Sequence, residues 1–187
     1  MDVGGGAAKE GDIYEALWAA LGMLDILSGR AKSIRIEEPG VPGMEYYVLY
    51  DDGHRVYWQC KQVGGSSTGW TMTSLRSQGV LQNINERLMI SGNEVVFATD
   101  TSAKDLFVLE DEAKRIRHFD RYQTELLPKG ARQVAFDHLA GIWNVPHLEI
   151  FSRLLRLRVE TAGQRFLRGQ LIERIGLRFD GNSATIL

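Results

Sequence analysis

The sequence predicts a single α/β domain built on a mixed sheet that is flanked by helices. Three observations support this: helical apolar spacing near the N-terminus, two aromatic, β-branched segments around a short turn, and a helix–strand–helix succession after them. The chain of 187 residues is 44% hydrophobic and 25% charged. This composition is typical of one ordered globular domain with a sizeable core.

The first predicted elements are a helix and a short strand. Apolar residues follow Asp12 at helical spacing, so Asp12 is expected to cap the helix, with residues 1–11 as a flexible lead-in. The helix should end at Ser28-Gly29. Alternation over Ser33–Glu37 predicts a strand, and the prolines and glycines of 39–43 predict a loop.

The segments Met44–Tyr50 and His54–Gln62 are expected to form a hairpin. A two-residue loop would turn the side chain of Glu45 away from Gln59 and Lys61. A three-residue loop, with its glycine in the left-handed conformation, would place Glu45 opposite Gln59. Both side chains and Lys61 would then share one face, which a common site requires.

After a polar loop at 64–69, helical spacing extends from Thr71 to Met89, although Gly79 weakens its centre. Glu94–Thr99 predicts a buried strand, and the polar residues 100–102 can cap a helix that begins near Ala103. The order so far is helix, three strands, helix, strand, helix.

From Gly130 to Gly176 the pattern is helical, with a break at 144–146. We therefore expect a core at 1–127 and a helical extension at 128–187 that packs on the core or mediates assembly. The chain shows no obvious terminal cap, so it is expected to be part of a larger protein.

Charge is unevenly distributed along the chain. The net charge is −2, which disfavours a dedicated DNA-coating protein. Acidic residues gather in the first third, and the arginines from Arg153 onward either contact a polyanion or flank a helix interface. The single Cys60 excludes an intramolecular disulfide and a thiolate metal cluster. With no membrane-length apolar run and no signal-peptide pattern, a cytoplasmic protein is expected.

Four side chains make up the candidate catalytic site: Glu15, Glu45, Gln59 and Lys61. The Glu45 carboxylate, the Gln59 amide oxygen and the backbone carbonyl of Cys60 could hold Mg²⁺ or Mn²⁺, which prefer oxygen ligands. Glu15 could bind a second metal or a metal-bound water. Lys61 could orient or help deprotonate that water and stabilise charge on a phosphodiester. Ordinary exposure explains each residue taken alone.

Other polar residues have weaker claims. Asp51 and Asp52 are expected to shape the turn, and they are the alternative metal ligands if the register differs. Contacts to DNA phosphates near the site are expected from a small set of residues, for which loop solvation is an equal explanation: Ser66, Ser67, Thr68 and Lys104.

The helix, hairpin and Gln59-Cys60-Lys61 tripeptide together resemble the PD-(D/E)xK nuclease superfamily. The resemblance implies a restriction-endonuclease-like core, αβββαβ, with the acid of the second strand at Glu45 and the helical glutamate at Glu15. This sequence departs from the pattern in having Gln59 where an acid is usual and Glu45 where aspartate is usual.

A closer resemblance is to the DUF4297-type, Cap4-like nuclease domains of bacterial anti-phage systems. It rests on 5–15, on Trp58-Gln59-Cys60-Lys61 and on Val95–Ser102, and it covers roughly 4–109. It implies a nuclease core that cleaves double-stranded DNA and is activated by assembly or by a partner. We expect a homo-oligomer, with an ATPase or nucleotide sensor as partner or fused domain and no membrane association. The alternative is a catalytically inactive nuclease-like module that binds DNA or protein, or an assembly scaffold.

Overall fold

The computed structural model describes residues 4–36, 43–63, 69–128 and 130–182. Its elements follow one another in this order: α1 (Gly4–Leu27), β1 (Ser33–Ile36), β2 (Tyr46–Leu49), β3 (Arg55–Lys61), α2 (Met72–Ser77), α3 (Val80–Leu88), β4 (Asn93–Thr99), α4 (Lys104–Ile116), α5 (Phe119–Arg121), the π-helical η1 (Tyr122–Leu126), α6 (Ala131–Trp143), α7 (His147–Leu154), β5 (Leu157–Thr161) and α8 (Gln164–Asn182). None of the described helices has both the length and the apolar character needed to cross a membrane.

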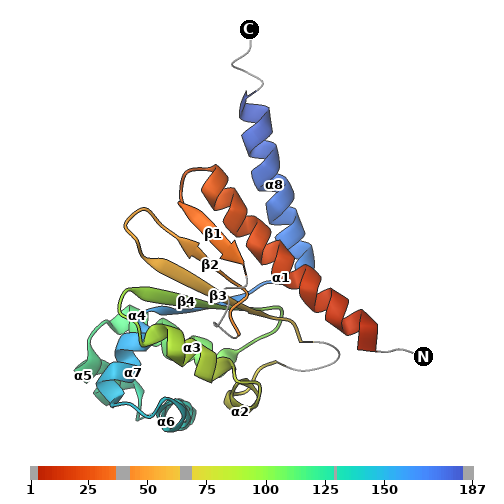
Figure 1. Ribbon diagram of the computed structural model, residues 1–187. Coiled ribbons are helices and arrows are strands. Elements are labelled where there is room, and N and C mark those ends of the chain that lie inside the picture. The colour runs from red at the N-terminus through yellow and green to blue at the C-terminus, as the bar shows by residue number, and fades with distance from the viewer. Residues whose placement is uncertain (1–3, 37–42, 64–68, 129, 183–187) are drawn as a thin grey trace.

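The five strands form one mixed sheet in the order β1-β2-β3-β4-β5. β1, β2 and β3 run antiparallel, while β3, β4 and β5 run parallel. Helices cover both faces, with α1 and α8 on one side and α2, α3, α4, α6 and α7 on the other (Figure 1). The prediction of an α/β fold with a mixed sheet is confirmed.

Each face of the sheet has its own hydrophobic core. The larger core joins Tyr57 and Phe97 of the sheet to α3, α4, α6 and α7. The smaller core joins Tyr46 and Cys60 of the sheet to α1. Tyr57, Val95 and Phe97 therefore face the larger core, and Trp58, Cys60 and Ala98 face the smaller one, as strand alternation requires. Lys61, the last residue of β3, departs from this rule, because its Nζ reaches Glu45 and Glu15 on the side of α1. This division decides which side chains can meet at a site.

The N-terminal helix is longer than predicted. It begins at Gly4, so Asp12 lies inside the helix and is not its N-cap. Four of the eight residues that precede Asp12 in α1 are glycines, which cost about 1 kcal/mol each in a helix, so propensity alone does not predict this start. The predicted end is confirmed, because Gly29 takes a φ of 69° and its N–H bonds to the Ile26 carbonyl.

The predicted helix at Thr71–Met89 divides into α2 and α3. Gly79, with a φ of 71°, stands between them, and Thr71 caps α2 through the Ser74 N–H. The predicted cap of α4 is wrong, because Ala103 occupies the N-cap position and no side chain caps it. The Asp100 carboxylate instead accepts a hydrogen bond from the Val63 N–H at 2.9 Å.

The segment after residue 128 is not wholly helical as predicted. The break at 144–146 is confirmed, but Leu157–Thr161 forms β5, which pairs in parallel with β4. Leu157 and Val159 are buried in the larger core. Their spacing fits both a helix and a strand over so few residues, so tertiary pairing decides the outcome.

Candidate active site

The hairpin between β2 and β3 sets the register of the site. The Tyr50 N–H donates to the His54 carbonyl at 3.1 Å, and Gly53 takes a φ of 86°. The three-residue loop is therefore confirmed. Asp52 shapes the turn as predicted, since its carboxylate accepts the His54 N–H at 3.1 Å. This turn stands at the opposite end of β3 from Lys61.

A β-bulge lies at Glu45, just before β2 begins at Tyr46. The ladder pairs Tyr46 with Trp58, and the Glu45 N–H also donates to the Trp58 carbonyl at 3.0 Å. Glu45 and Tyr46 therefore both lie opposite Trp58, and this extra residue shifts the alternation of the side chains that precede β2. Met44 accordingly lies in the larger core beside Tyr47, which regular alternation would forbid. Glu45 turns with Tyr46 toward the face that α1 covers.

The Glu45 carboxylate binds β3 just beyond the point where the pairing of β2 with β3 stops. Its Oε2 accepts the Cys60 N–H at 2.8 Å, and its Oε1 lies 2.6 Å from the Lys61 Nζ. The Lys61 Nζ is also 4.0 Å from Oε1 of Glu15 on α1. Three of the four predicted catalytic side chains therefore converge where β2 begins and β3 ends.

The pair of Glu45 and Lys61 is largely shielded from solvent, with side-chain exposures of 12% and 30%. Burial raises the pKa of the Glu45 carboxyl above its usual value, and Lys61 and the Cys60 N–H offset this only in part. Burial alone would lower the pKa of Lys61, but the charge and hydrogen bond of Glu45 outweigh it and raise that pKa. Lys61 is therefore a cation at neutral pH.

Gln59 stands apart from this group. It is the ladder partner of Phe97, so alternation places its side chain on the face of the larger core. It is fully buried, and among the described residues neither its amide oxygen nor its amide nitrogen has a hydrogen-bond partner. The expectation that Glu45 and Gln59 share a face is wrong, because the bulge turns Glu45 to the other side.

A cavity of about 240 Å³ opens beside Glu45. Glu15 and Asp12, one helical turn apart on α1, form one wall, and Tyr46 forms part of another. The Tyr46 hydroxyl is buried and has no hydrogen-bond partner in the part of the chain that the structure describes. Asp12 was predicted only as a cap, because its place beside Glu15 depends on α1 beginning eight residues earlier.

The donor set for a metal ion differs from the predicted one. Among described residues, no three His, Cys, Asp or Glu side chains gather closely enough to hold an ion. The carboxylates of Glu45 and Glu15 both lie within 4.0 Å of the Lys61 Nζ. The Cys60 carbonyl points to the same side of β3 as its N–H, because both groups of a strand residue face one neighbour. Oxygen ligands suited to Mg²⁺ or Mn²⁺ are therefore present without Gln59.

The predicted phosphate contacts are less defined. Lys104 is the exposed first residue of α4 and lines a separate cleft with Ala131 and Arg132. Ser66, Ser67 and Thr68 lie outside the described residues. The Cys60 N–H is a site group that sequence reasoning missed, since only the bulge brings the Glu45 carboxylate to it.

Comparison of the chain with protein-family models, curated proteins and solved structures found no match. The functional argument therefore rests on the residues and on the geometry at the end of β2 and β3.

Proposed function

We propose that this protein is a metal-dependent endonuclease with a restriction-endonuclease-like core, acting on double-stranded DNA in bacterial anti-phage defence. The carrying observation is the convergence of Glu15, Glu45 and Lys61 at one end of the sheet. The order α1-β1-β2-β3, helix, β4 supports the proposal, as does the mixed strand direction. The resemblance to Cap4-like domains supplies the substrate and the biological setting.

The proposed metal ligands are Glu45, the Cys60 carbonyl and Glu15. A bound Mg²⁺ or Mn²⁺ would supply an activated water and neutralise phosphate charge. Gln59 is not among these ligands, because its amide faces the opposite core. Because Lys61 is already paired with Glu45 at 2.6 Å, its ammonium must share that carboxylate with the ion.

In this proposal Lys61 acts as a fixed positive charge. A lysine whose pKa is raised stays protonated near neutral pH and cannot accept a proton from water. Its ammonium is placed to stabilise negative charge that develops on the scissile phosphate. Of the roles expected for Lys61, the proposal therefore uses charge stabilisation, and its part in deprotonating the water stays a prediction.

One such site cuts one strand, so cleavage of a duplex is simplest when two copies meet. We propose a cytoplasmic homo-oligomer that is activated by assembly or by an ATPase or nucleotide-sensor partner. Measurement of solution mass alongside cleavage, over a range of protein concentrations, tests this dependence.

The direct test is cleavage of supercoiled plasmid with Mg²⁺ or Mn²⁺. Wild-type protein should nick or linearise the plasmid, and Glu45→Gln and Lys61→Met should lower the rate at least about 100-fold. Glu94→Gln, an exposed glutamate on β4, is the matched control and should retain activity. The proposal fails if wild type is inactive at every metal and assembly state, or if all variants cut alike.

A second candidate is a nuclease-like module that binds DNA or protein without cleaving it. The burial of Gln59 favours it, since one position of the tripeptide supplies no ligand. The closed ion pair of Glu45 and Lys61 also satisfies both groups without a metal. DNA binding by wild type and Glu45→Gln alike, with no cleavage by either, would select this candidate.

A further inference from the structure

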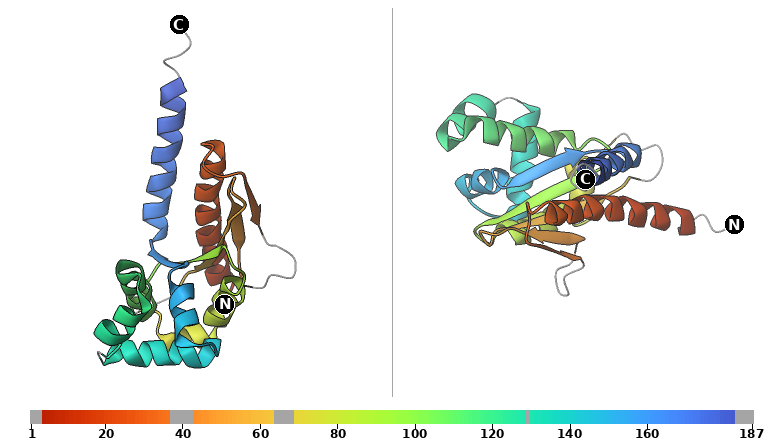
Figure 2. Two further views of the ribbon diagram at one scale, coloured as in Figure 1. Left: turned by 90° about the vertical axis from the view of Figure 1, so that its left-hand side faces the viewer. Right: turned by 90° about the horizontal axis from the view of Figure 1, so that it is seen from above.

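A groove runs between α1 and α8 on the face of the sheet opposite α3 and α4. α8 runs alongside the C-terminal half of α1 and then projects beyond the sheet (Figures 1 and 2). Cavities of about 430 and 270 Å³ occupy the space between them and share Arg174. Trp58 and Val48 of the sheet lie at the base of the larger cavity.

The groove is positively charged in a chain whose net charge is −2. Four arginines and two carboxylates line the two cavities: Arg30, Arg158, Arg174 and Arg178, with Asp25 and Glu160. The lining therefore has a net charge of +2, and the remainder of the protein is more acidic than its total suggests. An anionic ligand is favoured here over a cationic or neutral one.

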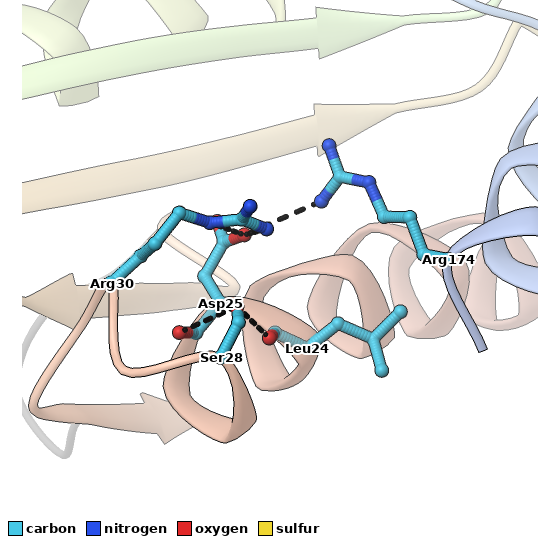
Figure 3. Close-up of polar contacts among 5 residues, drawn as sticks. All are labelled: Leu24, Asp25, Ser28, Arg30 and Arg174. Atoms are coloured by element: carbon cyan, nitrogen blue, oxygen red, sulfur yellow. Dashed lines mark hydrogen bonds and ion pairs between the residues drawn. The ribbon is translucent and has the colours of Figure 1, made fainter. Parts of the chain in front are cut away.

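Asp25 organises the centre of the groove. Its Oδ1 accepts from Arg30 Nη2 at 2.6 Å and from Arg174 Nη1 at 3.3 Å (Figure 3). Each guanidinium has five N–H donors, so one shared carboxylate leaves most of them available. The Ser28 hydroxyl bonds to the Leu24 carbonyl at 2.6 Å and helps to close α1 (Figure 3). Asp25 thus positions two arginines without neutralising both.

The arginine side chains are accessible to a ligand. Arg30 is 59% exposed, Arg174 40% and Arg158 50%. Ion pairs that are this exposed contribute little to stability, about 0–1 kcal/mol each. The guanidiniums can therefore exchange a carboxylate for a phosphate at small cost. Arg178 makes no ion pair with any described residue.

The charges form a row along the groove. Arg174 and Arg178 are four residues apart on α8, which is about 6 Å along the helix axis. A row of this kind suits a chain of regularly spaced anions, such as a phosphodiester backbone, better than one small anion. Arginine also presents a planar fork that matches phosphate oxygens.

We propose that the groove between α1 and α8 binds the phosphate backbone of DNA. The identity of the ligand rests on the proposed function. Asp25 is ten residues beyond Glu15 on α1, which is about 15 Å along the helix. That span corresponds to four or five base pairs at about 3.4 Å each. The distance along α1 between the arginines and the candidate active site is therefore within the length of one short duplex.

The test measures duplex binding by fluorescence anisotropy in EDTA, where cleavage cannot occur. The double variant Arg174→Gln/Arg178→Gln should bind about tenfold more weakly and lose about two units of salt dependence in a plot of log affinity against log salt. The control Arg115→Gln/Arg121→Gln removes the same charge from exposed arginines on α4 and α5. It should bind within twofold of wild type.

Two results would overturn the proposal. In the first, the groove variant and the control lose affinity equally. In the second, millimolar inorganic phosphate raises the Tm of wild type but not of the groove variant, while no duplex binds; this would assign a site for a small anion. A third result separates the two proposals. If duplex binding depends on the arginines but no cleavage occurs, the proposed catalysis is wrong and the groove assignment stands.

Discussion

Replacement of Lys61 by methionine should destabilise the protein in a pH-dependent way. The substitution leaves the Glu45 carboxylate, 12% exposed, without its counter-charge at 2.6 Å. Breaking a fully buried ion pair costs about 3–5 kcal/mol; because Glu45 keeps the Cys60 N–H and some solvent, we expect about 2 kcal/mol near neutral pH. For a chain of this size that corresponds to a Tm lower by about 4–8 °C.

The pH dependence follows from the raised pKa of Glu45. Its value in the unfolded chain is close to 4.5, and loss of Lys61 raises the folded-state pKa further. When the folded state holds the proton more tightly, stability falls as the pH rises from the unfolded pKa through the folded one. The deficit relative to wild type should therefore be small near pH 4 and complete near pH 8.

Urea denaturation of wild type and Lys61→Met at both pH values measures this directly. Lys32→Met, at an exposed lysine before β1, is the control and should shift stability by less than about 0.5 kcal/mol at either pH. An equal deficit at pH 4 and pH 8, or no deficit at pH 8, would refute the argument that Glu45 is ionised, buried and held by Lys61.

Three further predictions concern the groups around the site. Gln59→Met should raise the free energy of unfolding by about 1 kcal/mol, because it removes an unpartnered buried amide, while Gln82→Met at an exposed position should change it little. Chemical denaturation checks both, and a loss of stability in Gln59→Met would show that the amide has a partner. Tyr46→Phe should likewise be neutral or stabilising by up to about 1 kcal/mol, and a clear loss in the same assay would show that the hydroxyl is bonded. Gly53→Ala should cost about 1–2 kcal/mol because Gly53 has a φ of 86°, and a neutral result would contradict the three-residue turn.

Much of the architecture was predictable because local signals and tertiary structure agree. Gly53 after two aspartates favours the left-handed turn residue that the hairpin adopts. Gly79 marks the division between α2 and α3, and Gly29 marks the end of α1. In each case one residue type satisfies a backbone demand that few others can meet.

β5 and the start of α1 were not predictable in the same way. Leu157 and Val159 become a strand because β4 offers a parallel edge, and that edge is far away in sequence. Asp12 has the chemistry of a helix cap, and four of the eight α1 residues before it are glycines, so local propensity predicts a later start than the one observed. Long-range pairing and marginal propensities decide such cases.

The site itself was predictable in its members and not in its geometry. The regular hairpin register predicted that Glu45 and Lys61 would meet, but it also placed Gln59 beside them. The bulge has no signature at its own positions, because neither Glu45 nor Tyr46 is a glycine or proline. It is that bulge which separates Glu45 from Gln59 and brings its carboxylate to the Cys60 N–H.

Mn²⁺ titration followed by electron paramagnetic resonance tests the central claim most directly. If the bulge makes Glu45 the metal ligand and turns Gln59 out of the site, Glu45→Gln should weaken Mn²⁺ binding at least about tenfold. Gln59→Met should bind the ion as wild type does. Equal loss in the two variants would contradict the account, because it would place the amide and the carboxylate on one ion.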